Sequence, residues 1–307
     1  MNDKVPHSTQ WAVYFYGTTA HHPSRSRPGD AIPIRRSFSW GEDTWHVPAI
    51  YPCTAGLVMD LCTEVDPERM YSFIQKWDLL NEDKHTYTLE EQDQIRSEHP
   101  LSHNFSAALT LNGRPLTHKS SSGFGWIPGL EAPDSTKQFL DHYQLNPERA
   151  WSFHRLRFLW ATKRRPAIRT LSLTLSQAPV AIPVGRFAST APGQNTKFRH
   201  PVTGKTHTLT VVDWKPQTLD LREAAQNSPN HCLVIGYTLT PPLAKEAFSL
   251  RDCAPDDADG PTCAIFTVPK GGIRAACSSL HFQPVEEVEW RMLVHEKTRE
   301  DMIVTLL

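Results

Sequence analysis

The sequence predicts a mostly β protein of the α+β class, with a β-sandwich-like C-terminal half and an N-terminal half built from a sheet with a few packed helices. Short segments that alternate apolar and polar residues favour strands, and turn signals separate them. Proline (25) outnumbers glycine (15), which favours stiff connections over long helices. Hydrophobic residues make up 39% and charged residues 21% of the 307 residues, as in globular proteins.

The clearest signal is the stretch Trp151–Ser176, which predicts a long β-hairpin with a basic turn at Thr162–Pro166. In its second arm, Leu171, Leu173 and Leu175 alternate with Thr and Ser residues. Because neighbouring strand residues point to opposite faces, the three leucines are expected in the core.

The N-terminal half begins with a segment, Trp11–Tyr16, that is apolar on both faces and predicts a central strand. Three further strands are expected at Arg35–Trp40, Trp45–Tyr51 and Gly56–Val65. A strand at Phe105–Leu111 then runs into the hairpin signal Asn112-Gly113 and returns from Leu116, and the composition of Lys119–Gly125 predicts a flexible stretch.

Three helices are expected. Asp66 can cap the first, which starts at Pro67 and carries an apolar stripe; this set is Met70, Phe73, Ile74, Trp77 and Leu80. The motif Thr88-Leu-Glu-Glu91 is a capping box that opens a polar, exposed helix ending before Pro100. A third short helix is expected at Asp134–Leu145.

The C-terminal half contains strand patterns only, with turns between them. The expected strands are Thr196–His200, Lys205–Trp214, Cys232–Thr240, Cys263–Val268, Ile273–Phe282, Val285–Val294 and Met302–Leu306. We predict a boundary between domains 1–148 and 149–307, with an alternative boundary near 188–196.

Charge is distributed unevenly along the chain. Residues 1–150 hold 13 Lys and Arg against 19 Asp and Glu, and residues 151–307 hold 19 against 14, giving −6 and +5. This asymmetry suggests that the halves attract each other, that the chain self-associates, or that it binds another protein. The overall charge of −1 argues against nucleic-acid binding.

The sequence lacks an apolar run long enough for a membrane helix and a signal-peptide pattern, so we expect no membrane association and a cytoplasmic location. The six cysteines form no CxxC pair and are expected to be buried thiols.

Motifs that could bind a cofactor or a metal are incomplete. Gly204-Lys205-Thr206 resembles the end of a P-loop, but Arg199 replaces the first glycine and a strand pattern follows. Asp252–Gly260 resembles a calcium loop in the wrong register. The histidine candidates show too few converging ligands for a metal; these are His21-His22, His99 with His103, and His281 near Cys277. We therefore predict no cofactor and no metal.

A basic-aromatic group predicts an interaction surface around the expected hairpin: Arg155, Arg157, Trp160, Lys163, Arg164 and Arg165. The function expected from the sequence is a binding or structural module without an evident catalytic site, since no GxSxG frame is present. The alternative is a hydrolase at the seam between the halves, which would gather titratable residues such as His154, Asp213 and Glu289.

Over Phe198–Val211 and Ala275–Met292 the chain resembles bacterial proteins that have no assigned function. The resemblance covers most of the chain, implies no activity and supplies no site residues. Asp259–Thr262 also resembles a short motif of the β-subunit of sodium-pumping decarboxylases, a membrane protein whose spans have no counterpart here.

Overall fold

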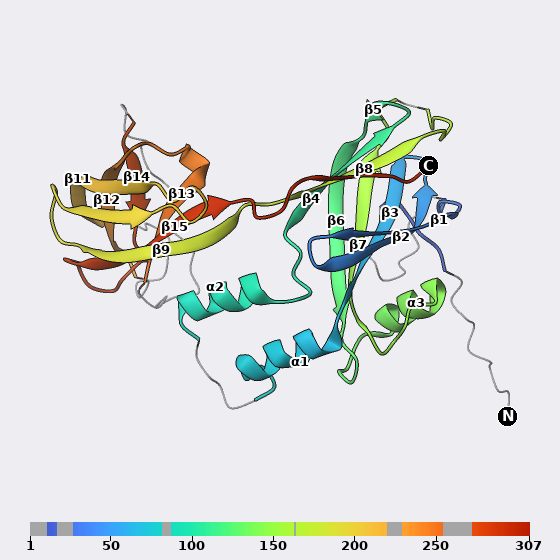
Figure 1. The fold of residues 1–307 in the computed structure, drawn as a ribbon, viewed down its shortest axis with the longest axis horizontal. Coiled ribbons are helices and arrows are strands. Elements are labelled where there is room, and N and C mark those ends of the chain that lie inside the picture. The colour runs from blue at the N-terminus through green and yellow to red at the C-terminus, as the bar shows by residue number, and fades with distance from the viewer. Residues whose placement is uncertain (1–10, 17–26, 82–86, 163, 220–228, 254–271) are drawn as a thin grey trace. The chain divides into compact units, whose positions relative to one another are not determined.

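A computed structural model describes residues 11–16, 27–81, 87–162, 164–219, 229–253 and 272–307 (Figure 1). The chain is mostly β with a few helices, as the sequence predicts. It divides into two compact units. Unit 1 comprises residues 1–83, 98–178 and 299–307, and unit 2 comprises residues 84–97 and 179–298.

Unit 1 contains two antiparallel sheets, of five and four strands. The first has the order β1 (Ile32–Trp40), β2 (Asp43–Pro52), β3 (Gly56–Val65), β7 (Ala150–Leu159) and β6 (Thr117–Trp126). The second has the order β16 (Met302–Thr305), β8 (Leu171–Gln177), β4 (Phe105–Leu111) and β5 (Arg114–Pro115). Helices α1 (Pro67–Lys76) and α3 (Asp134–Tyr143) complete the unit.

One core cluster joins the two sheets of unit 1. Leu171, Leu173 and Leu175 of β8 are buried in it, which confirms the predicted alternation. In β3, Leu57, Met59 and Leu61 belong to the same cluster, whereas Val58 and Cys62 belong to clusters on the opposite face of the sheet. Because β3 is covered on both faces, it is buried over almost its whole length.

The predicted hairpin over Trp151–Ser176 is wrong, although both of its strands exist. Strand β7 pairs with β3 and β6, and β8 pairs with β4 and β16, so the two arms lie in different sheets. The arms are adjacent in sequence, but each pairs with two other strands.

Two further expectations for unit 1 are corrected. Trp11–Tyr16 is not a central strand, because it makes only an isolated bridge between Val13 and Gly29; its burial comes from packing of Val13 and Phe15 against the five-stranded sheet. Lys119–Gly125 is not a flexible stretch but part of the edge strand β6, whose polar composition suits its exposure.

The predicted helices are confirmed. Asp66 accepts a hydrogen bond from the Glu68 backbone N–H at 3.0 Å, and the apolar stripe of α1 is buried at Met70, Phe73 and Ile74. Leu80 lies beyond the end of α1 and is exposed. The turn after β4 has positive φ at both Asn112 (50°) and Gly113 (75°), as the predicted hairpin requires.

Unit 2 is a sandwich of a four-stranded and a three-stranded sheet around one apolar core. The first sheet has the order β10 (Asn195–Arg199), β11 (Thr206–Thr218), β12 (His231–Thr240) and β14 (Arg274–Cys277). The second has the order β13 (Phe248–Asp252), β15 (Val288–Glu296) and β9 (Val180–Ser189), and a 3₁₀ turn, η1 (Lys245–Ala247), precedes β13. The predicted alternation in β12 is confirmed, since Leu233, Ile235 and Tyr237 are buried in the core.

Unit 2 also includes helix α2 (Leu89–Glu98), apart from its last residue. The capping box is present as predicted: the Glu91 N–H donates to Thr88 Oγ1 at 3.2 Å, and the Thr88 N–H donates to Glu91 Oε2 at 2.9 Å. This helix comes from the N-terminal part of the chain, so unit 2 is not strands alone.

The division into units differs from the expected boundary near residue 148 and from the alternative near 188–196. Both β7 and β8 belong to unit 1, and the chain crosses into unit 2 between Ala178 and Pro179. It returns at Arg299, so the last strand, β16, pairs with β8 of unit 1 and not with the C-terminal sandwich.

Candidate functional site

Three arginines form a row across the three-stranded sheet of unit 2, which we call the arginine row. Arg251 of β13 lies directly opposite Arg291 of β15, and Arg291 lies directly opposite Arg186 of β9. The core residues of β15, including Trp290 and Met292, flank Arg291 in sequence and point to the opposite face. The arginine row is therefore on the outer face of the sandwich.

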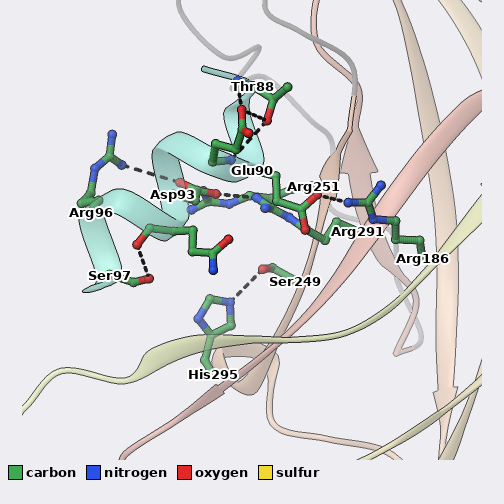
Figure 2. Close-up of polar contacts among 12 residues, drawn as sticks. Thr88, Glu90, Asp93, Arg96, Ser97, Arg186, Ser249, Arg251, Arg291 and His295 are labelled. Carbon is green, nitrogen blue, oxygen red and sulfur yellow. Dashed lines mark hydrogen bonds and ion pairs between the residues drawn. The ribbon is translucent and has the colours of Figure 1, made fainter. Parts of the chain in front are cut away.

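Helix α2 places two acidic side chains on the arginine row (Figure 2). Asp93 Oδ2 accepts from Arg291 at 2.5 Å and from Arg251 at 2.7 Å, and Glu90 forms an ion pair with Arg186. Arg186 also lies 3.7 Å from Glu289 Oε2 on β15. Every arginine of the row thus has a carboxylate partner on α2.

The spacing of the two acids matches the spacing of the strands. Three helical residues rise about 4.5 Å along a helix axis, and neighbouring strands lie about 4.8 Å apart. Glu90 and Asp93 are three residues apart, so they share one helix face and meet successive strands of the sheet. A helix that crosses the strands can therefore bring its two carboxylates to arginines on neighbouring strands.

Electrostatics explains why the arginine row needs an anionic occupant. Like charges placed directly opposite each other on neighbouring strands destabilise a sheet, and here three guanidinium groups stand side by side. Guanidinium is planar, remains charged and matches the geometry of carboxylates. The arrangement is costly without acids and favourable with them.

Burial divides the row into a covered centre and exposed ends. The Arg291 side chain is 5% exposed, whereas Arg251 and Arg186 are 50% and 46% exposed. Exposed ion pairs contribute only about 0–1 kcal/mol each, because water and salt screen them. Docking of α2 through the two outer arginines is therefore weak.

Other polar groups surround the arginine row. Ser249 Oγ lies 2.8 Å from His295 Nε2 beside it, and Arg96 lies 3.8 Å from Asp93 Oδ1 on α2 (Figure 2). Burial, and then the charge of Arg251, lower the pKa of His295. At neutral pH His295 is consequently an uncharged neighbour, and the positive charge comes from the arginines.

The interaction surface predicted from sequence is not assembled. Arg155 and Arg157 are buried on one face of β7, and Trp160 is buried in the core cluster on the other side. Arg164 and Arg165 are exposed, and Lys163 lies outside the described residues. The period of two along a strand separates residues that look like one cluster in the sequence.

Arg155 instead completes a buried polar network on the outer face of the five-stranded sheet. It donates through Nε and a terminal nitrogen to both oxygens of Asp60, each at 2.8 Å. Tyr143 also donates to Asp60 at 2.6 Å, and Tyr51 lies 2.7 Å from the Tyr143 hydroxyl. Burial alone would lower the pKa of Arg155, but Asp60 outweighs it and the pKa is raised. Burial raises the pKa of Tyr51 to about 12. Arg155 and Tyr51 therefore keep their protons, and the network links α3, through Tyr143, to Asp60 of the sheet.

A serine and a histidine approach each other on the inner face of β7, but not as a nucleophile and its base. Ser152 Oγ donates its single proton to the Leu101 carbonyl at 3.1 Å, so the contact of 3.0 Å with His154 must use a proton on His154 Nε2. A general base would have to accept from the serine instead. Ser152 is also 3% exposed, which leaves a substrate no access to it.

The other titratable residues named for a hydrolase do not share a unit with His154. His154 belongs to unit 1, and Asp213 and Glu289 belong to unit 2. There Asp213 pairs with Lys215 at 2.6 Å, and Glu289 lies near Arg186.

Of the incomplete cofactor and metal motifs, the P-loop-like one lies in a turn between strands, and parts of the others lie outside the described residues. Gly204 (φ 68°) ends the tight connection between β10 and β11, where a P-loop would need a helix. Most of Asp252–Gly260, the strand expected at Cys263–Val268 and the His21-His22 pair lie outside the described residues. Among the residues that the structure describes, no group of three His, Cys, Asp or Glu side chains is placed to hold a metal ion.

Sequence reasoning missed the arginine row because its members are 65 and 40 residues apart in the chain and no local pattern links them. The capping box at Thr88 and the acids that follow it were visible, but they predict only a solvated helix. The register of β9, β15 and β13 aligns the arginines that pair with these acids.

Within the described part of the chain, none of the helices combines the length and the apolar character needed to cross a membrane. Comparison of the chain with protein-family models, with curated proteins and with solved structures gives no match.

Proposed function

We propose that this protein is a binding module and that the arginine row of unit 2 is its recognition surface for acidic helical segments. The observation that carries the proposal is the pairing of three arginines, aligned across three strands, with Glu90 and Asp93 of α2. In this conformation α2 occupies the surface as an intramolecular ligand.

The chemistry of the surface defines the ligand. It is a helix with carboxylates at positions i and i+3, because this spacing matches the step from one strand to the next. The central carboxylate fills the most buried position, beside Arg291, and the outer one meets Arg186 at the edge. An acidic helix of another protein that satisfies the same spacing competes with α2 for the arginine row.

The test uses a labelled peptide covering residues 87–98 and the full chain carrying Glu90→Gln and Asp93→Asn, which removes the acids of the internal ligand. Fluorescence anisotropy should show saturable binding of the peptide, weakening at least tenfold between 0.05 and 0.5 M salt, because the contacts are ionic. The unmodified chain should bind the same peptide more weakly, since its own α2 competes.

Two matched controls separate recognition from general charge attraction. A peptide that itself carries Glu90→Gln and Asp93→Asn should lose binding, and so should the chain that also carries Arg186→Gln and Arg251→Gln. Equal binding of the acidic and the neutral peptide, or binding unaffected by the arginine changes, would contradict the proposal.

A further inference from the structure

We infer that Ser37, His46 and Glu64 form a hydrolytic site on the outer face of the five-stranded sheet of unit 1, and that its substrates are carboxylic esters. The inference goes beyond the proposed function, because the arginine row belongs to unit 2. It is carried by the contacts of the three side chains, by the exposure of the serine and by the position of β1 at the edge of the sheet.

The register of three neighbouring strands brings these side chains together. Ser37 of β1 lies directly opposite His46 of β2, and His46 lies opposite Cys62 of β3, two residues before Glu64. Residues two apart on a strand share a face, and diagonal neighbours on adjacent strands are within reach of long side chains. His46 therefore lies between a hydroxyl and a carboxylate. Ser37 Oγ is 2.8 Å from His46 Nδ1, and Glu64 Oε2 is 3.8 Å from His46 Nε2.

The neighbouring carboxylate determines the direction of the contact between Ser37 and His46. A carboxylate only accepts hydrogen bonds, so Glu64 favours the tautomer of His46 that carries its proton on Nε2. His46 Nδ1 then holds a lone pair, and the Ser37 hydroxyl donates to it, as a nucleophile donates to its base. Burial lowers the pKa of His46, although the charge of Glu64 opposes the shift. The ring is consequently uncharged at neutral pH and can take up a proton.

Glu64 is held where it can stabilise the imidazolium that forms on His46. Its other oxygen, Oε1, accepts a hydrogen bond from Arg149 Nε at 2.7 Å. His46 Nε2 is buried and has no hydrogen-bond partner among the described residues, since 3.8 Å to Glu64 is too long for one. Catalytic hydrogen bonds that are long in the free protein shorten in the complex with substrate. Glu64 is therefore a positioning residue that acts through His46.

Ser37 meets the two requirements that Ser152 fails. Within the described part of the chain, the hydrogen-bond partner of the Ser37 hydroxyl is His46, whereas Ser152 donates its proton to a backbone carbonyl. Ser37 is also exposed on an edge strand, whereas Ser152 is buried. A substrate can reach Ser37.

The backbone of Ser37 supplies a donor for the oxyanion that develops during the reaction. Trp40 and Asp43 flank a two-residue turn and so form a hydrogen-bonded pair, and pairs with and without backbone hydrogen bonds alternate along an antiparallel ladder. Ser37 and His46, three pairs further on, are a pair without them. The Ser37 N–H therefore points away from β2, toward the edge at which the described residues place no further strand.

The reaction is a two-step ester hydrolysis. Ser37 Oγ attacks the carbonyl carbon while its proton passes to His46 Nδ1, and the Ser37 N–H stabilises the oxyanion. Arg35 and Arg36, exposed and next to Ser37 in the chain, add positive potential. The bond between the carbonyl carbon and the alcohol oxygen breaks, and the alcohol leaves with the proton from His46. Water then attacks the acyl-serine and gives a proton to His46, which returns it to Ser37 as the carboxylic acid departs. Esters are the expected class, because an alcohol leaves more readily than an amine.

The experiment measures hydrolysis of 4-nitrophenyl acetate by the full chain and its labelling by diisopropyl fluorophosphate, from which a serine oxygen displaces fluoride. The chain should turn over the ester, and peptide mass spectrometry should find the diisopropylphosphoryl group on Ser37. Ser37→Ala should abolish both, and His46→Gln should slow labelling about 100-fold. Glu64→Gln should lower kcat by at least about tenfold with KM unchanged, a split that a merely structural role would not produce.

Ser39→Ala is the matched control, because Ser39 is exposed on the same strand but lies opposite Thr44. It should leave hydrolysis and labelling unchanged. Absence of the label from Ser37, hydrolysis that persists in Ser37→Ala, or equal labelling of His46→Gln and the unmodified chain would overturn the site. If a variant of His46 or Glu64 loses its native near-ultraviolet circular dichroism, the two exposed serines decide the outcome. Peptide binding by the arginine row should be the same in all these variants, so failure of one proposal leaves the other standing.

Discussion

At the scale of single residues, the buried Asp60–Arg155 pair and the half-exposed pairs of the arginine row show how burial decides the role of an arginine. Asp60 is fully buried, so its charge depends on Arg155 and on the hydroxyl of Tyr143. Arg186 and Arg251 keep half of their surface in water and can exchange partners at little cost. The first arrangement serves the fold of unit 1, and the second is the one on which the proposed binding surface rests.

Arg155→Ala should lower the free energy of unfolding of unit 1 by about 3–5 kcal/mol, because it leaves the Asp60 carboxylate buried without its charged partner. Urea titration followed by tryptophan fluorescence measures the change. Arg164→Ala is the matched control: Arg164 is an exposed basic residue of the same sequence cluster, and its removal should change stability by less than about 0.5 kcal/mol. Equal effects of the two substitutions would contradict the role given to Asp60–Arg155.

At the scale of elements, the short strand β16 is important to unit 1 although its pairing partner, β8, lies far from it in the sequence. It pairs with β8 over Met302–Thr305 and contributes Val304 to the core of unit 1, which Leu306, just after the strand, also joins. The Trp40 indole N–H donates to the Glu300 carbonyl at 2.8 Å in the same segment. The last nine residues therefore close one edge of the four-stranded sheet.

Removal of residues 299–307 should destabilise unit 1 by about 3–6 kcal/mol, because two buried aliphatic side chains, at about 1.5–3 kcal/mol each, lose their apolar environment. Hydrogen exchange measured by mass spectrometry should show faster exchange in β8 and β4 and little change in β12. Ile303→Ala, at a side chain that is 70% exposed, is the control and should leave exchange in β8 unaltered. Faster exchange confined to unit 2 would refute the assignment of β16 to unit 1.

At the scale of the whole molecule, the two units should respond differently to acid. Burial lowers the pKa of His103 to about 4, although the charge of Asp43 opposes the shift. Burial also lowers the pKa of His154 to about 4, and the neighbouring His103 adds a smaller shift in the same direction. Both histidines lie in unit 1, where Arg299 and Arg69 also disfavour a charge on His103. The 3.8 Å contact between His103 and Asp43 is therefore not an ion pair at neutral pH.

Acidification should unfold unit 1 before unit 2. The unfolded histidines take up protons near pH 6.5 and the folded ones only near pH 4, so between these values the unfolded state binds more protons. The stability is complete above pH 6.5 and falls as the pH drops, by about 1.4 kcal/mol per pH unit for each histidine. Urea titrations between pH 4.5 and 7 measure the slope, and His154→Gln should reduce it by the share of one histidine. An unchanged slope in that variant would rule out this origin of acid sensitivity.

Local patterns alone were sufficient for the fold class and most elements. The leucines of β8, the cap of α1 at Asp66, the capping box of α2 and the Asn112-Gly113 turn all depend on interactions within a few residues, so the sequence predicts them directly. The same patterns could not choose partners for the strands. Both arms of the expected hairpin were correct as strands, but their pairing with β3 and β4 joins residues that are 60 to 103 positions apart in the chain.

The candidate site was decided by tertiary structure. Arg186, Arg251 and Arg291 become one surface only when β9, β15 and β13 adopt their register, and Asp93 reaches them only because an N-terminal helix packs on a C-terminal sheet. Conversely, the basic cluster that is contiguous in sequence is split by the alternation of β7 and buried at Arg155 and Arg157. Sequence by itself determined which segments form strands and helices, because backbone propensity and periodicity are local. Only the fold determined which charges meet, because charge pairing depends on distance in space.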